Sequence, residues 1–132
     1  DLRVRFGDIT GNVARHNALE VLAGSLPDAI FAASDELAFG FMKALLEHEV
    51  GVPDEIAVTG FTDSPTAGIV TPELTTVEQP THRLVMVAAR MLFDMIDGIP
   101  AADTTPQEIV LLPKLKIRAS CGNRRHINTL FE

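Results

Sequence analysis

The chain has 132 residues, of which 46% are hydrophobic and 22% charged, values that fit one soluble globular domain with a substantial core. The formal net charge of −7 argues against this segment binding the phosphate backbone of nucleic acid by itself. The absence of Trp and Tyr predicts an aliphatic core. The single cysteine, Cys121, excludes an internal disulfide, and no apolar run reaches the length of a membrane span. The opening DLRVRF has neither an initiator Met nor a signal peptide, so we expect a piece of a longer, cytoplasmic protein.

The first half of the chain alternates predicted strands and helices. Apolar and basic residues alternate over residues 2–6, which predicts a strand, and helical spacing follows over 13–22 with Thr10 or Asn12 as the cap. Next in chain order are a short buried strand at 28–33, a helix at 34–50 capped by Ser34 or Asp35, and a third strand at 55–61. This order predicts the α/β class: a doubly wound, mostly parallel sheet with helices on both faces.

The second half is less regular. A strand is predicted at 74–79 and a helix at 81–97, where a wide apolar stripe must be buried against another part of the protein. Residues 99–107 have the composition of a loop. Residues 108–120 predict two strand pieces broken at Pro113.

Sequence motifs for catalysis, metal binding and phosphate binding are missing. The glycines form neither of the common phosphate-binding patterns, and no G-x-S-x-G turn occurs. The histidines lack zinc-ligand spacing, and Cys121 has no His-Asn pair placed to activate it. We therefore expect no metal, no cofactor and no enzyme activity.

Polar residues instead follow each of the first three predicted strands. In a parallel sheet the carboxyl ends of the strands meet at one edge, where ligands bind. Taken singly, each residue can be a helix cap or a turn residue. Taken together, these short hydroxyl and carboxyl groups suit a small polyhydroxylated ligand. The residues are Asp8, Ile9 and Thr10, then Ser34 and Asp35, then Thr62, Asp63 and Ser64.

Three chained motifs carry a family resemblance. PDAIFAASDELAFG, VPDEIAVTGFTDSP and TPELTTVEQP cover most of residues 27–80, and EIVLLPKLKIRASCG follows near the end. In this order they resemble the effector-binding domain of LacI/GalR-type bacterial transcriptional repressors. The resemblance extends over nearly the whole chain, and the chain of motifs is much more specific than any one of them.

The resemblance implies a periplasmic-binding-protein-like fold of two lobes with the effector in the cleft. This chain would form mainly the C-terminal lobe, with residues 75–97 crossing into the N-terminal lobe and the DNA-binding domain absent. The implied effector-binding residues are Ile9, Ser34, Asp35, Thr62, Asp63 and Gln79. Ser34 replaces the usual Asn and Thr62 the usual Asp, so the effector, a sugar or related polar metabolite, remains open.

The resemblance also implies a homodimer through the C-terminal lobe, with operator DNA bound only by the missing N-terminal domain. The matching surface contains Phe39 and Met42, which we expect to face away from the sheet, together with Ile69 and Val70. The alternative function is a periplasmic sugar-binding protein of an uptake transporter, which shares the fold. An α/β enzyme is a weaker alternative, since no nucleophile with its base is visible.

Overall fold

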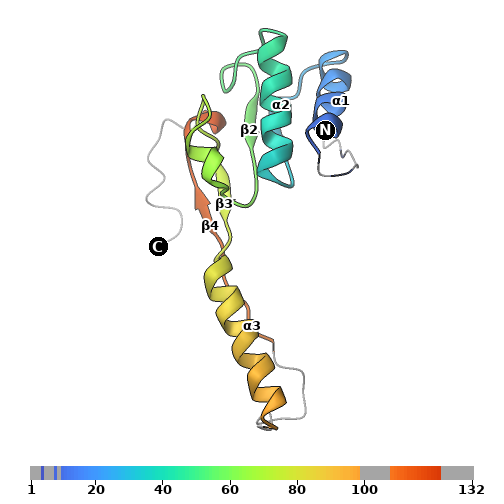
Figure 1. The fold of residues 1–132 in the computed structure, drawn as a ribbon. Helices are drawn as coiled ribbons and strands as arrows, with labels where there is room; N and C mark the ends of the chain where they lie inside the picture. The colour runs from blue at the N-terminus through green and yellow to red at the C-terminus, as the bar shows by residue number, and fades with distance from the viewer. Residues whose placement is uncertain (1–3, 5–7, 9, 99–107, 123–132) are drawn as a thin grey trace. The chain divides into compact units, whose positions relative to one another are not determined.

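The structure, a computed structural model, describes residues 4, 8, 10–98 and 108–122. The helices are α1 (Gly11–Leu22), α2 (Asp35–Glu47) and α3 (Thr81–Ile96), and the strands are β1 (Ala29–Phe31), β2 (Ala57–Thr59), β3 (Thr76–Glu78) and β4 (Lys114–Lys116). Two short 3-10 helices are η1 (Pro65–Gly68) and η2 (Ala119–Cys121). The chain divides into two units (Figure 1): the described residues of Asp1–Glu78 and Leu115–Glu132 form the first, and those of Gln79–Lys114 form the second.

Helices α1 and α2 begin at side-chain caps. Oγ1 of Thr10 accepts a hydrogen bond from the backbone N–H of Val13 at 3.3 Å, and Oγ of Ser34 accepts one from Leu37 at 3.3 Å. Both caps have extended backbone conformations and satisfy N–H groups that the first helical turn leaves unpaired. The prediction of a cap before each helix is confirmed, with Thr10 rather than Asn12 at the first.

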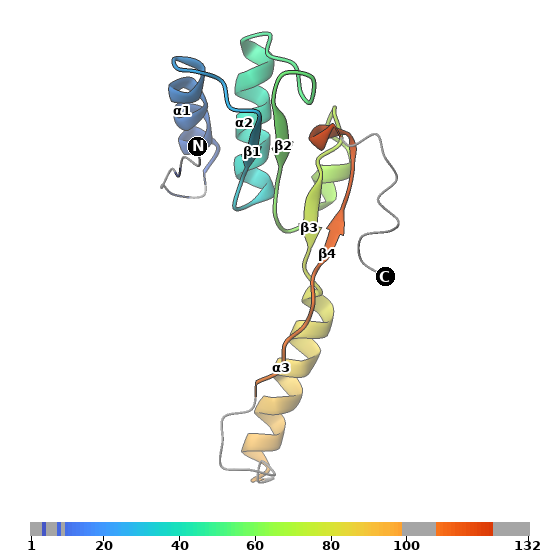
Figure 2. The ribbon, with the colours of Figure 1, turned by 180° about the vertical axis from the view of Figure 1, so that it is seen from behind.

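The sheet of the first unit is built around the parallel pair β1 and β2, in which Ile30 lies opposite Val58. An isolated parallel bridge joins Thr59 to Thr75, and β3 pairs with β4. Helices α1 and α2 lie on the same face of the β1–β2 pair (Figures 1 and 2). Ile30 packs against the core clusters beneath these helices, whereas the next residue, Phe31, is 67% exposed, as the alternation of side chains along a strand requires.

The core of the first unit is aliphatic, as the composition predicts. One cluster fills the space between α2 and β2, and a smaller one joins α1 to α2. The larger cluster consists of Ala32, Ala38, Met42, Leu45, Ile56, Val58, Ala67 and Leu74, and the smaller of Ala14, Ala18, Phe41 and Ala44.

Helix α2 therefore buries two adjacent stripes rather than one. Ala38, Met42 and Leu45 belong to the larger cluster, while Phe41 and Ala44 meet α1. The expectation that Met42 faces away from the core is wrong, because its spacing of four from Ala38 places it in the same row, and it is 8% exposed.

The second unit consists of α3 and the segment 108–114. None of the residues of α3 is buried. Its apolar stripe is present as predicted, but the described residues of this unit do not cover it. Leu84, Val85, Leu92, Met95 and Ile96 of this stripe are exposed, and so are Met86 and Phe93 on another face of the helix.

The α/β class and the parallel sheet are confirmed, and the strands are shorter than predicted. Residues 28–33 give a strand of only Ala29–Phe31, because strand bounds depend on pairing partners as well as on composition. The prediction of a strand piece at 108–112 is wrong, since only Lys114–Lys116 of this region pairs. The strand predicted at 2–6 (Val4 apart) and the loop at 99–107 lie outside the described residues.

Candidate effector-binding site

Two of the three polar strand ends come together in the first unit. Because β1 and β2 run parallel, the segments after them leave the sheet at the same edge. The backbone N–H of Asp35 donates to the carbonyl of Phe61 at 3.0 Å, which fixes the start of α2 against the loop after β2. At the first strand end, Asp8 and Thr10 are exposed, and Ile9 lies outside the described residues.

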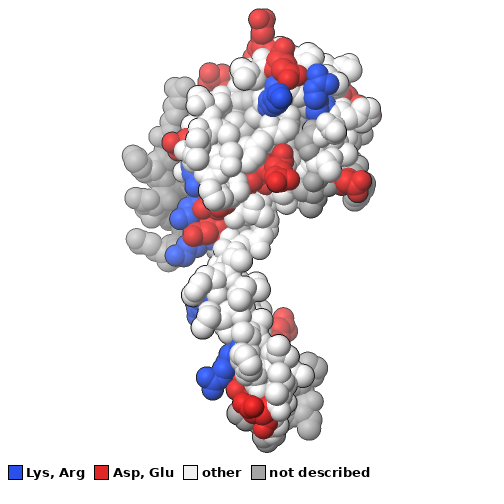
Figure 3. Space-filling model, in the orientation of Figure 1, with Lys and Arg blue, Asp and Glu red and all other residues white. Residues whose placement is uncertain are grey.

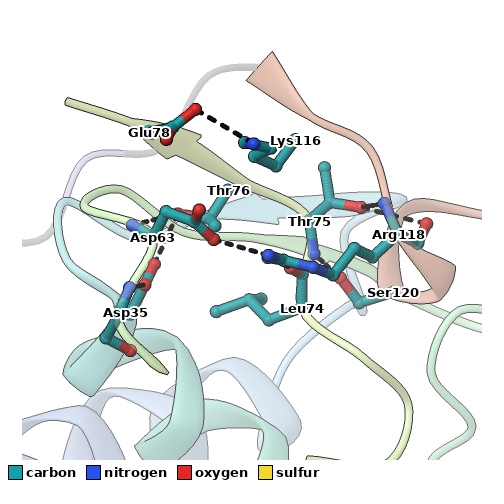
Figure 4. A network of polar contacts seen from close by, with 10 residues as sticks. Asp35, Asp63, Leu74, Thr75, Thr76, Glu78, Lys116, Arg118 and Ser120 are labelled. Atoms are coloured by element: carbon teal, nitrogen blue, oxygen red, sulfur yellow. Dashed lines mark hydrogen bonds and ion pairs between the residues drawn. The ribbon is translucent and has the colours of Figure 1, made fainter. Parts of the chain in front are cut away.

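Asp35 anchors this edge from the first turn of α2. Its side chain is buried, with the residue 1% exposed, and both carboxylate oxygens accept hydrogen bonds. Oδ2 accepts from the backbone N–H of Ser64 at 2.6 Å, and Oδ1 accepts from Oγ1 of Thr76 at 2.5 Å. A buried carboxylate requires such donors, and the positive end of the α2 dipole favours its charge. Asp35 therefore joins α2, the loop and β3 at one point (Figure 4).

The loop after β2 is held in an uncommon conformation at two successive residues. Thr62 has a φ of 129° and Asp63 a φ of 54°, both in the range that non-glycine residues rarely adopt. Such a residue costs about 1–3 kcal/mol and persists only where its surroundings impose it. The backbone N–H of Thr62 donates to the carbonyl of Val77 at 3.0 Å, so β3 is one of the elements that impose it.

Arg118, which follows β4, supplies another restraint on the loop. Its guanidinium donates to Oδ1 of Asp63 at 2.6 Å and to the carbonyl of Leu74 at 2.8 Å. The side chains of the pair are 20% and 17% exposed. The charged partners are thus largely withdrawn from water, which strengthens their interaction relative to a surface pair.

Ser120, in η2, connects the backbone of β2 to the residue before β3. Its Oγ accepts from the backbone N–H of Thr75 at 2.9 Å and donates to the carbonyl of Val58 at 2.6 Å. Ser120 is fully buried. It therefore links β2, the residue before β3 and η2, and keeps the strands under the loop in place.

The remaining predicted site residues have different surroundings. Ser34 is 9% exposed and is occupied as the cap of α2. Thr62 is exposed at the strand end, and Asp63 is half-buried beside it. Gln79 follows β3 and is the first residue of the second unit. The structure therefore brings together Ser34, Asp35, Thr62 and Asp63.

Arg118, Thr76 and Ser120 also belong to this site, and no local sequence pattern predicts them. Arg118 and Ser120 lie in the closing segment EIVLLPKLKIRASCG, which carries part of the family resemblance. Their roles depend on contacts across 44 to 62 residues of sequence, which local patterns do not reveal.

The described ranges also lack features of other kinds of site. They contain no group of three or more His, Cys, Asp or Glu side chains arranged to hold a metal ion. No helix among them is both long and apolar enough to cross a membrane.

The parallel α/β fold places a polar and tightly restrained loop at the carboxyl edge of its sheet, which is where ligands bind in folds of this class. The family model of the periplasmic binding protein-like domain matches residues 3–121. The chain belongs to this family.

The relatives are bacterial transcriptional regulators. The HTH-type transcriptional regulator MalR of Streptomyces coelicolor is 36% identical over 106 residues, which are 80% of this chain and 30% of MalR. The transcriptional regulator CelR in complex with cellobiose is structurally similar, with a TM-score of 0.79, 35% identity, and coverage of 89% of this chain and 35% of CelR. A LacI-family transcriptional regulator from Lactobacillus casei with bound sucrose has a TM-score of 0.71 and 36% identity. The match covers 84% of this chain and 40% of that regulator.

These relatives confirm the resemblance to the effector-binding domain of LacI-type regulators. The chain spans about a third of the length of the curated relatives that it matches. These relatives are transcriptional regulators and not enzymes.

Proposed function

We propose that this chain is the sensing part of a LacI-type transcriptional repressor, which binds a small polyhydroxylated effector, a sugar or a related metabolite. The observation that carries the proposal is the strained, anchored loop at Thr62 and Asp63, beside the start of α2. Strain of this kind concentrates at ligand sites. The sugars bound to the related regulators support the same class of effector.

Within this proposal, Thr62, Asp63 and Ser34 are the residues of the first unit that contact the effector. Thr62 is exposed at the strand end, and the carboxylate of the half-buried Asp63 is an acceptor for a ligand hydroxyl. Asp35 acts mainly by positioning the loop, since both of its oxygens are already bonded. Ile9 and Gln79 complete the proposed site.

The regulatory step follows from a coupling between two sites. Effector binding in a cleft between two lobes changes their arrangement, and with it the affinity of a DNA-binding domain elsewhere in the protein, by a coupling free energy of about 1–3 kcal/mol. Residues 79–97 would belong to the other lobe, where the apolar stripe of α3 would be covered. A repressor of this kind works in the cytoplasm.

The test is the effect of sugars on DNA binding by the full-length protein. We expect sucrose, cellobiose or ribose to bind by calorimetry, and the same sugar to change the affinity for operator DNA in a gel-shift assay. Sugar binding without any DNA binding would favour the alternative, a sugar-binding protein of an uptake transporter.

We also propose that the protein forms a homodimer through the first unit. A pocket of about 450 Å³ lies beside the C-terminal half of α2, away from the strand ends. It is lined by Phe39, Met42, Lys43, Leu46, Val50, Gly51, Val52, Val70, Thr71 and Pro72. Figure 3 shows a broad uncharged area on the corresponding face of this unit.

The exposure of two apolar residues here supports a second copy of the chain as the occupant. Leu46 on the pocket wall is 75% exposed, and Ile69, next to Val70, is 79% exposed. A two-fold operator requires a two-fold protein, and isologous pairing uses one self-complementary patch.

Leu46→Asp tests the dimer with little cost to the fold, because Leu46 is exposed whereas Val70 also packs on the core. We expect light scattering to show a wild-type dimer and a weaker dimer for Leu46→Asp, since an unpaired charge would enter an apolar interface. Leu26→Asp, at another exposed leucine, is the control. A wild-type monomer, or equal masses for both variants, would exclude this surface.

A further inference from the structure

Arg118, which follows β4, contacts the loop of residues 61–64 after β2, called here the effector-site loop. Its Nη2 donates to Oδ1 of Asp63 at 2.6 Å, and its Nη1 donates to the carbonyl of Leu74 at 2.8 Å (Figure 4). The guanidinium therefore connects the backbone carbonyl of Leu74, two residues before β3, to the carboxylate of Asp63 in the strained loop. A guanidinium can hold both partners at once, because its donors lie in one rigid plane.

The backbone of Arg118 is attached independently of its side chain. Its N–H donates to Oγ1 of Thr75 at 2.8 Å, and its carbonyl accepts from the same oxygen at 3.1 Å. Removing the guanidinium thus leaves these attachments of the segment after β4 in place. The interactions lost would be the ion pair with Asp63 and the hydrogen bond to the carbonyl of Leu74.

The loop needs this hold, because its conformation is unfavourable by itself. Thr62 and Asp63 both have positive φ values, and the N–H of Asp63 has only a long contact, 3.4 Å, to Oγ1 of Thr76. On the other side of the strained pair, the N–H of Ser64 is fixed by Asp35 at 2.6 Å. Arg118 and Asp35 thus restrain the loop from two different elements.

The ion pair uses only part of the carboxylate. Among the described residues, Oδ1 of Asp63 has a bonded partner and Oδ2 has none. The side chain of Asp63 is 17% exposed, so a hydroxyl of a ligand can reach it. Pairing with Arg118 also offsets the negative charge, so the site would favour a neutral hydroxylated ligand over a cationic amine.

We propose that Arg118 is a positioning residue for effector recognition: it fixes Asp63 so that Oδ2 accepts a hydroxyl of the effector. This inference rests on the proposed function. It assigns the carboxylate acceptor to Asp63, one residue after Thr62, which stands where the resemblance implies an acidic residue.

The first measurement needs no ligand. Hydrogen–deuterium exchange in the full-length protein compares Arg118→Gln with the wild type and with Lys116→Gln. Lys116 is the control, because its 3.0 Å ion pair with Glu78 is more exposed and lies on the neighbouring strands. We expect faster exchange at residues 61–64 in Arg118→Gln alone, with α2 unchanged. Equal exchange in this loop for all three proteins would overturn the inference.

The second measurement is the dissociation constant for sucrose, cellobiose and ribose by calorimetry, at a temperature where melting curves show every variant folded. We expect Arg118→Gln to raise the dissociation constant of the sugar that the wild type binds by about tenfold. This change is equivalent to the loss of one charge-assisted hydrogen bond. Arg118→Lys should restore part of this loss. Asp63→Asn combined with Arg118→Gln should be no weaker than the more affected single variant, because both act on one contact.

A purely structural role predicts a different pattern. Lower melting temperatures with unchanged sugar affinity would overturn the positioning role. Binding of none of the three sugars by the wild type would count against the proposed sugar effector. Faster loop exchange in Arg118→Gln would then still support the hold on Asp63, so the two failures are distinguishable.

Discussion

Gly60, the residue between β2 and the effector-site loop, is expected to tolerate no side chain. A Cβ built on this residue would overlap Oδ1 of Asp35 and lie 2.9 Å from Cδ2 of Leu74. Neither neighbour can move cheaply, because Leu74 is fully buried and Asp35 is tied to Ser64 and Thr76 by short hydrogen bonds. Gly60→Ala must therefore displace core atoms or break the anchor of the loop.

The expected cost combines two effects that overlap. Overpacking of a core costs about 1–3 kcal/mol. Disturbing a hydrogen bond to a charged group costs about 1.5–3 kcal/mol. We expect Gly60→Ala to lower the free energy of unfolding by about 3 kcal/mol, which corresponds to a fall in melting temperature of roughly 10 °C for a domain of this size.

Far-UV circular dichroism is the suitable assay, since this chain contains no Trp or Tyr for fluorescence. Gly68→Ala is the matched control, because nothing lies within 4 Å of a Cβ at that position and its φ is not in the left-handed range. It should leave the melting temperature unchanged or slightly raised. Equal melting temperatures for the two variants would refute the close approach of Asp35 to Gly60.

Three further predictions concern the core and the site. Leu74→Ala should lower the free energy of unfolding in urea by about 2–5 kcal/mol, and Leu46→Ala by less than about 0.5 kcal/mol, because Leu74 is 0% and Leu46 75% exposed; equal effects would contradict the core described above. Ser120→Ala should cost about 1–3 kcal/mol in the same assay by leaving a buried N–H and a buried carbonyl without their partner, and a negligible loss would contradict that role. Thr62→Asp should change the order of calorimetric affinities for sucrose, cellobiose and ribose, and an unchanged order would mean that Thr62 does not contact the effector.

The helix starts were predictable from the sequence because capping is local. Thr10 and Ser34 each bond an N–H three residues ahead, a distance that a sequence pattern can display. The contact between Arg118 and Asp63 spans 55 residues and depends on which strand β4 joins, so no local pattern reveals it. Strand bounds were misjudged for the same reason: apolar composition predicts strand character, but pairing decides where a strand ends.

The contacts that hold the effector-site loop also join it to the two segments of chain that lead into the second unit. Asp63 is held by Arg118 of the segment after β4, and its backbone N–H donates to Oγ1 of Thr76 on β3 at 3.4 Å. Along the chain, β3 ends where the second unit begins, and β4 begins where that unit ends. A hydroxyl bound by Asp63 would therefore act on both segments that connect the two units, through the 2.6 Å contact with Arg118 and the 3.4 Å contact with Thr76. Contiguous contacts of this kind carry coupling where the elements they join have two arrangements, and we propose that an effector biases that choice at this loop.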